Sequence, residues 1–120
     1  MVRARHRFHS RVSVQRVYRL GKVVRGTAIT LKYATRSDAQ SYRAAVVVSK
    51  KVHKSAVVRN RIRRRVYEII RRHVRADASY DMVFMVYTAD AATQPASDLE
   101  KMVMGLLSRA AVPLREPAMV

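Results

Sequence analysis

The chain has 120 residues and a formal net charge of +17, from 25 Lys and Arg against 8 Asp and Glu. This length suits one domain with a modest core, and the 49% hydrophobic content indicates a folded chain. The charge predicts a polyanionic partner, nucleic acid in preference to an anionic membrane. The absence of cysteine excludes disulfides, thiolate zinc sites and a cysteine nucleophile.

The positive charge is concentrated in the first part of the chain. Residues 1–75 hold 22 basic and 2 acidic residues, whereas residues 76–120 hold 3 basic and 6 acidic residues. Of the basic residues, 19 are Arg, whose planar guanidinium favours bidentate contacts with phosphates and bases. No apolar run is long enough to cross a membrane, and no signal-peptide core follows the N-terminus. We therefore expect a cytoplasmic protein without a membrane partner.

The apolar pattern predicts secondary structure in the first half of the chain. A short helix is expected over residues 10–20, ended by Gly21. Residues 23–33 alternate in polarity around Gly26, which predicts a hairpin or a bent strand. Residues 42–49 are rich in β-branched side chains and predict a central strand.

The second half continues with a helix, a strand and a helix. Ser55 is the expected N-cap of a long helix over residues 56–75. Residues 80–88 contain an unbroken apolar run, which predicts a strand buried on both faces. Ser97 and Glu100 have the spacing of a capping box at the start of the last helix.

This order of elements predicts the fold class. The strand, helix and strand over residues 42–88 form a βαβ unit. We therefore expect an α/β (α+β) two-layer sandwich with one mixed sheet. The whole of residues 1–120 is expected to form a single RNA-binding domain, with a flexible basic arm at 1–7 and a flexible tail at 113–120.

A run of arginines opens the long helix. Residues 59–65 carry five positive charges and no anion, and such self-repulsion destabilises a helix unless a polyanion neutralises it. The alternative is a solvated helix face. Ile62 anchors the segment to the core, so the arginines project from a rigid element. The candidate RNA-binding residues are Arg59, Asn60, Arg61, Arg63, Arg64 and Arg65.

A second basic segment, Ser49, Lys50 and Lys51, lies where a strand ends and next to the N-terminus of that helix. Backbone N–H groups and cations there predict an anion site, although an ordinary basic turn is the alternative. Tyr18 and Tyr33 lie beside basic residues and either stack on unpaired bases or pack in the core.

The sequence gives little support for catalysis by protein groups. The four histidines are scattered, and Asp77, Asp81 and Asp90 have no paired spacing. Nothing resembles a nucleophile with its base, a metal triad or a phosphate-binding glycine loop. We expect no catalytic residue, no metal ligand and no small-molecule substrate.

The stretch VVSKKVHKSAVVRNRIRRR, from Val47 to Arg65, resembles the protein subunit of bacterial ribonuclease P. That family carries SKK at a strand end, followed by a helix that opens with an RNR motif. More weakly, residues 15–21 resemble the first helix of the family and residues 80–87 its last strand.

The resemblance implies an αβββαβα fold like that of the second domain of a small-subunit ribosomal protein, with a left-handed βαβ crossover. It also implies a protein cofactor that binds the catalytic ribonuclease P RNA and the 5′ leader of precursor tRNA. Endonucleolytic removal of the leader is then carried out by the RNA with Mg²⁺. The implied leader cleft contains Val14, Tyr18, and Lys32 or Tyr33.

Several positions depart from the family pattern. His53 replaces a frequent glycine after SKK, and Tyr67 replaces a frequent arginine one turn beyond the RNR motif. Thr88 stands where an arginine commonly follows the last strand, and Val14 replaces an aromatic residue of the first helix.

The main alternative is a ribosomal or other structural RNA-binding protein without a role in tRNA processing. A stand-alone metal-dependent nuclease is less consistent with the sequence, which offers no metal cluster. A helix-turn-helix DNA regulator is disfavoured by the two apolar strands.

Overall fold

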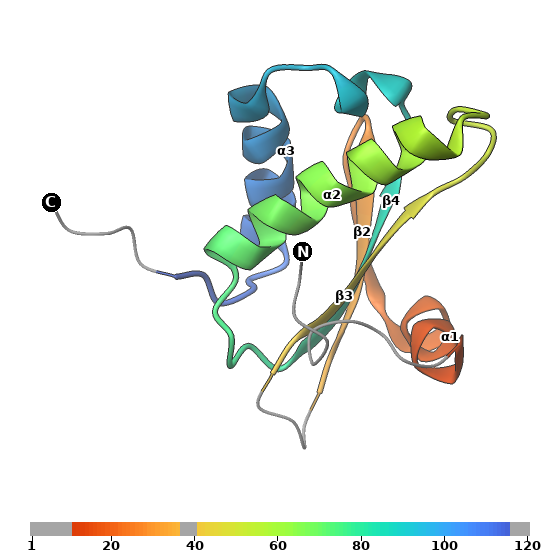
Figure 1. Cartoon of the computed structure of the whole chain (residues 1–120). Coiled ribbons are helices and arrows are strands. Elements are labelled where there is room, and N and C mark those ends of the chain that lie inside the picture. The colour runs from red at the N-terminus through yellow and green to blue at the C-terminus, as the bar shows by residue number, and fades with distance from the viewer. Residues whose placement is uncertain (1–10, 37–40, 116–120) are drawn as a thin grey trace, which may run out of the picture.

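The computed structural model describes residues 11–36 and 41–115. The element order is helix, three strands, helix, strand, helix, which confirms the predicted αβββαβα order (Figure 1). The elements are α1 (Arg11–Leu20), β1 (Lys22–Arg25), β2 (Ile29–Thr35), β3 (Arg43–Val48), α2 (Ala56–His73), β4 (Tyr80–Val86), the short 3-10 helix η2 (Ala89–Ala92) and α3 (Ala96–Arg109). The basic arm at 1–7 lies outside the described residues.

The strands form one mixed sheet in the order β1-β2-β4-β3. β1 and β2 pair antiparallel, as do β2 and β4, whereas β3 pairs parallel with β4. The prediction that residues 42–49 form a central strand is wrong, because β3 is an edge strand and β4 is the inner one. An outward-facing N–H of β3, that of Val46, is satisfied by the hydroxyl of Tyr67 at 3.1 Å. A side chain of α2 thus takes the place of a strand partner for one N–H group at this edge.

The helices lie on both faces of the sheet. α2 and α3 contact each other and pack over one face, whereas α1 contacts β2 and β4. Val83 of β4 points to the face of the sheet opposite α2 and α3, because its neighbours along the strand point toward those helices. Val83 and Val17 of α1 are nevertheless fully buried. α1 therefore covers part of the opposite face, which stays open beyond it.

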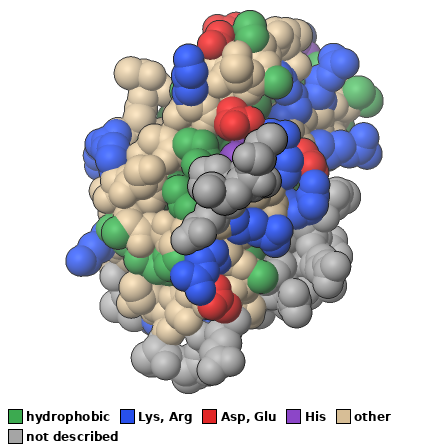
Figure 2. Space-filling view, turned by 90° about the vertical axis from the view of Figure 1, so that its left-hand side faces the viewer, with side chains coloured by type: hydrophobic (Ala, Val, Ile, Leu, Met, Phe, Trp, Pro, Cys, Tyr) green, Lys and Arg blue, Asp and Glu red, His purple; other side chains and the backbone are tan. Residues whose placement is uncertain are grey.

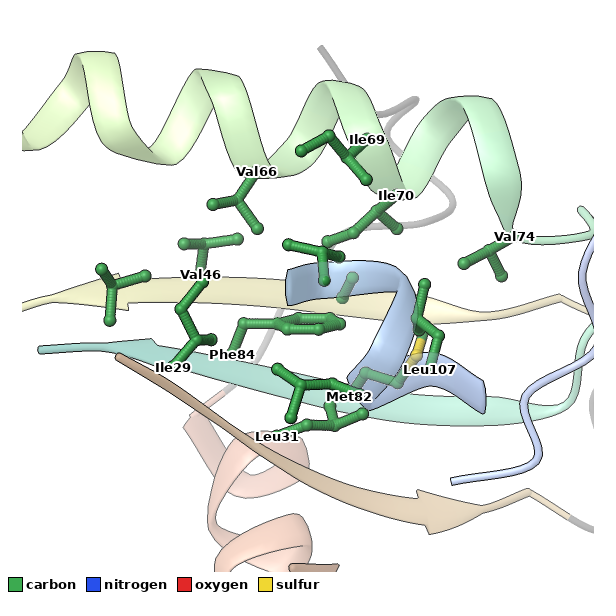
Figure 3. Close-up of a cluster of buried hydrophobic side chains, with 14 of the residues drawn as sticks. Ile29, Leu31, Val46, Val66, Ile69, Ile70, Val74, Met82, Phe84 and Leu107 are labelled. Atoms are coloured by element: carbon green, nitrogen blue, oxygen red, sulfur yellow. The ribbon is translucent and has the colours of Figure 1, made fainter. Parts of the chain in front are cut away.

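The main core lies between the sheet and the layer of α2 and α3. Figure 3 shows side chains of the strands pointing up to α2 and across to α3. Phe84 is central, and its partners in register are Leu31 of β2 and Val46 of β3. The core residues labelled there are Ile29, Leu31, Val46, Val66, Ile69, Ile70, Val74, Met82, Phe84 and Leu107.

Local interactions explain where two of the helices begin or end. Gly21 directly follows α1, and only glycine fits there, because an added Cβ would collide with the carbonyl oxygens of Val17 and Tyr33. Ser55 caps α2 as predicted, since its hydroxyl accepts a hydrogen bond from the Val58 N–H at 3.4 Å. The helix ends at His73, two residues earlier than expected, because the extended backbone of Val74 pairs with Leu114.

The capping box predicted at Ser97 is wrong. α3 begins at Ala96 with Pro95 as its N-cap, and no side chain caps it. The Pro95 carbonyl accepts from the N–H groups of Asp98 and Leu99 at 3.0 and 3.2 Å, which places Ser97 inside the first turn. The fixed φ of proline suits this entry into a helix.

The segment predicted as a tail begins by pairing with the end of α2. The Arg75 N–H donates to the Pro113 carbonyl at 3.0 Å, and the Arg115 N–H donates to the His73 carbonyl at 2.7 Å. Residues 113–115 are thus held against the core, and residues 116–120 lie outside the described part of the chain.

Candidate nucleic-acid interface

A tight turn connects β3 to α2 and presents two lysines. The Val52 N–H donates to the Ser49 carbonyl at 3.0 Å, which closes the turn. The side chains of Ser49, Lys50 and Lys51 are all exposed. Because α2 begins shortly afterwards, these cations lie on the side of the molecule where the helix presents its N-terminus.

Arg59 and His53 hold the loop that leads into α2. The Arg59 guanidinium donates to the carbonyls of His53 and Lys54 at 2.8 and 2.9 Å. The Nδ1 atom of His53 accepts a hydrogen bond from the Ser55 N–H at 3.0 Å. His53, which departs from the family pattern, therefore stabilises the loop before the helix. Arg59 stabilises the same loop, so part of its hydrogen-bonding capacity is used within the fold.

Arg61 and Arg64 are the free cations of the helix. Both side chains are exposed, and neither has a hydrogen bond or ion pair within residues 11–36 and 41–115. They lie three positions apart and therefore project from the same side of α2. Between them Ile62 is fully buried, so the backbone that carries them is fixed to the core.

Asn60 and Arg63, two more of the candidate RNA-binding residues, bond to each other. Arg63 donates through Nη2 to the Oδ1 atom of Asn60, and Asn60 is exposed. This bond leaves the Asn60 amide N–H groups as donors and orients Arg63 along the helix. The pair can contact a phosphate or a base edge next to Arg61.

Arg65 is occupied by the fold. Its guanidinium donates to the carbonyls of Ala91 and Gln94 at 2.7 and 2.6 Å. These bonds tie α2 to the connection between β4 and α3. The sequence pattern groups Arg65 with the candidate RNA-binding arginines, but its contacts show that it stabilises the fold.

No acidic residue of α2 lies near the arginines at the start of the helix. Its single acid, Glu68, bonds Arg71 through both carboxylate oxygens. This hydrogen bond to Arg71 lowers the pKa of Glu68 below its usual value and raises the pKa of Arg71. Figure 2, which faces the end of α2, shows further Lys and Arg side chains on the right of the view, with acidic side chains among them.

On the other face of the sheet, α1 and β2 bring Tyr18 and Lys32 together. The Lys32 Nζ atom lies 4.9 Å from the centroid of the Tyr18 ring, and Tyr18 is 41% exposed. Val14 is half-buried on the same helix. The alternation along β2 turns Tyr33 to the opposite face, where its ring packs 5.9 Å from that of Tyr80. Of these two residues, Lys32 therefore shares a face with Tyr18, and Tyr33 does not.

The sheet beside α1 presents an apolar surface that the sequence pattern did not single out. Val23 of β1 and Val47 of β3 are 42% and 39% exposed. Val23 pairs with Lys32, and Val47 pairs with Met85 of β4. This face thus combines exposed apolar side chains with the Tyr18–Lys32 pair, a combination suited to unpaired bases.

Asp81 organises the margin of that face, and the sequence analysis missed it. Its carboxylate is fully buried and accepts from Arg43 at 2.8 and 2.7 Å and from Arg16 at 3.3 Å. Arg36 lies 3.5 Å away. A lone carboxylate inside the apolar run of residues 80–88 was the available signal, because a buried charge needs partners.

Two further departures from the family pattern have structural explanations. The hydroxyl of Tyr67 satisfies the edge strand β3, as described above. Thr88 caps η2, since its Oγ1 atom accepts from the Asp90 N–H at 3.2 Å. Both positions support the scaffold in this chain.

Among the residues that the structure describes, no group of three or more His, Asp or Glu is arranged to hold a metal ion. In the same part of the chain, no helix is long and apolar enough to cross a membrane.

The sequence and the fold of this chain are similar to those of known proteins. The ribonuclease P protein component of Pseudanabaena sp. is 39% identical over 71 residues, which cover 59% of this chain and 61% of that protein. A variant of the Staphylococcus aureus RNase P protein has a TM-score of 0.76 at 20% identity and covers 90% of each chain. The Thermotoga maritima RNase P protein has a TM-score of 0.73 at 21% identity, over 86% of this chain and 96% of that one.

The two structures establish the fold. A profile of the family described as Ribonuclease P matches residues 2–111, nearly the whole sequence and all the elements described above. The chain therefore belongs to the ribonuclease P protein family.

Proposed function

We propose that this protein is the protein subunit of a ribonuclease P, the endoribonuclease that removes the 5′ leader of precursor tRNA. It would bind the catalytic RNA subunit and the precursor, and act in the cytoplasm. The observation that carries the proposal is the pair Arg61 and Arg64, exposed and unpaired within the described residues on a helix of a ribonuclease P family fold.

The α2 surface suits a folded RNA. Arg61, Arg64 and the Asn60–Arg63 pair project from a helix whose opposite side is buried, so their positions are set before binding. The turn at Ser49, Lys50 and Lys51 extends the positive charge beyond the helix. Guanidinium groups and amides of this kind bind phosphates and base edges.

The opposite face suits a single strand. Tyr18 offers a partly exposed ring for stacking, and Lys32, whose Nζ atom lies over one face of that ring, offers a charge for a phosphate. An RNA strand without a complement exposes its bases to such a surface. We infer that this face receives the leader while α2 contacts the RNA subunit.

The hydrolysis itself is assigned to RNA. A pair of Mg²⁺ ions held by RNA phosphates can activate water and stabilise the leaving oxygen without a protein base. The protein would contribute by neutralising phosphates and positioning the precursor. Its binding would therefore weaken as the salt concentration rises.

The double substitution Arg61→Ala with Arg64→Ala tests this assignment. We expect weaker binding to a bacterial ribonuclease P RNA, and a slope of log K against log salt that is smaller by about 1.4–1.8 if each arginine neutralises one phosphate. The measurement is a binding titration at several salt concentrations. Circular dichroism should show an intact fold, because both side chains are exposed.

The matched control is Arg71→Gln with Arg75→Gln, which removes the same charge from exposed ion pairs at the other end of the helix. It should retain near-normal affinity. Equal losses in both double variants would show that only net charge matters, and tight binding to ribosomal RNA instead would favour a structural RNA-binding role.

A further inference from the structure

A trough bordered by cations runs along the β1 edge of the sheet. It consists of two hollows that share Arg109 in their linings. One, of about 560 Å³, lies between the β1–β2 turn and α3. The other, of about 400 Å³, lies between α1, the start of β1 and the C-terminal end of α3. We call this surface the β1-edge trough. Its basic residues are Arg16, Lys22, Arg25, Lys101 and Arg109.

Arg16 and Arg109 of this trough bond to Asp81 and to the Arg25 carbonyl, but part of the remaining charge has no partner in the described part of the chain. None of the described residues that line either hollow is acidic. Lys22 and Lys101 have no hydrogen bond or ion pair within residues 11–36 and 41–115. Residues 76–120 contain three cations, and two of them, Lys101 and Arg109, line the trough. An anionic occupant would account for this placement in the acidic part of the chain.

Apolar and aromatic side chains lie among the polar groups that line the trough. Ile29 and Leu106 line the hollow beside α3, and the packed rings of Tyr33 and Tyr80 line the other. Arg109 lies between them and donates to the Arg25 carbonyl at 3.2 Å, which holds its side chain across the β1 edge. Cations next to aromatic rings match a single-stranded nucleic acid better than an inorganic anion.

Gly105 supplies a separate observation. It lies inside α3, where glycine is less favourable than alanine. An added Cβ would meet nothing within 4 Å, so packing within the described chain does not require a glycine there. Gly105 lines the first hollow and leaves the helix backbone open to whatever occupies it.

We propose that the β1-edge trough binds single-stranded RNA, namely the part of the precursor leader that extends beyond the Tyr18–Lys32 surface. Lys22, which lines the second hollow, precedes Val23 in β1, and Val23 pairs with Lys32, so a strand on the Tyr18–Lys32 surface can continue around the β1 edge into the trough. This inference rests on the proposed function, because it requires a precursor with a leader.

The test compares precursors whose leaders have about 4 and about 16 nucleotides, a range typical of single-strand binding surfaces. Each is bound to the complex of the full chain with a bacterial ribonuclease P RNA. The wild-type complex should bind the long-leader precursor more tightly than the short-leader one. Lys101→Gln with Arg109→Gln should weaken long-leader binding by about fivefold and leave short-leader binding unchanged.

Two further variants sharpen the test. Gly105→Ala should raise the melting temperature and retain long-leader binding, since a methyl group adds little bulk. Gly105→Gln should also raise the melting temperature but reduce long-leader binding, because its side chain extends into the trough. The control Arg71→Gln with Arg75→Gln should bind both precursors as the wild type does.

Several results would overturn the inference. These are equal binding of both leaders by the wild type, equal losses on both leaders in the variants, or normal long-leader binding by Gly105→Gln. If the variants lost affinity for the RNA subunit in the absence of precursor, the trough would be a binding site for that RNA. This result would also contradict the proposal that the trough binds the leader. Failure of the proposed function is distinct, because the wild-type complex would then bind a precursor no better than mature tRNA.

Discussion

Neighbouring arginines of α2 perform different tasks, although the sequence presents them as one run. Consecutive positions on a helix are rotated by about 100°, so Arg64 points to solvent while Arg65 reaches the carbonyls of Ala91 and Gln94. Arg59 is likewise drawn to the loop before the helix. The charge run therefore overstates the number of side chains that are free to contact RNA, and Arg61 and Arg64 are the clearest candidates.

The carboxylate of Asp81 is the other residue whose environment decides its role. Asp81→Asn should lower the free energy of unfolding by about 3 kcal/mol, because it removes the negative charge that holds the guanidinium groups of Arg16 and Arg43 together. Urea denaturation followed by circular dichroism measures the loss.

Asp77→Asn is the matched control, since Asp77 and Arg75 form an exposed ion pair at 2.9 Å. We expect it to cost less than about 1 kcal/mol. Similar costs for the two substitutions would contradict the role of Asp81 as a buried organising charge.

At the scale of elements, the packing of α1 against the sheet creates the proposed leader surface. Tyr18→Ala should weaken binding of a precursor with a leader by about fivefold or more, as expected for the loss of one stacked base. Binding of mature tRNA should not change. The measurement is the affinity of each RNA for the reconstituted complex.

Tyr18→Phe keeps the aromatic ring and should bind the precursor normally. Because Tyr18 is 41% exposed, neither substitution should unfold the protein. An equal loss of affinity for precursor and mature tRNA in Tyr18→Ala would show that the residue does not contact the leader.

The elements themselves were largely predictable from sequence, because their signals are local. The cap at Ser55 and the apolar run of residues 80–88 identified α2 and β4. The position of a strand within the sheet was not predictable, since β3 and β4 are equally apolar and only tertiary packing makes β3 the edge. The choice between Lys32 and Tyr33 also required the structure, because a shift of one residue along a strand reverses its face.

For the whole molecule, the net charge of +17 is divided between surface and scaffold. α2, the turn before it, α1 and β1 carry most of the exposed cations of the described residues, whereas the acidic second part supplies the inner strand β4 and the closing helix α3. Of the three cations in that second part, Lys101 and Arg109 lie at the β1-edge trough. The resulting scaffold presents separate basic surfaces on its two faces, which suits a protein that contacts two RNA molecules at once.

The most direct test is reconstitution of leader removal. The purified full chain is mixed with a bacterial ribonuclease P RNA at a magnesium concentration where that RNA alone cleaves slowly, and the single-turnover rate of 5′ leader removal is measured. We predict that the protein raises this rate by about tenfold or more, equivalent to about 1.4 kcal/mol of barrier, and that the protein without RNA does not cleave. An unchanged rate, or cleavage by the protein alone, would contradict the account.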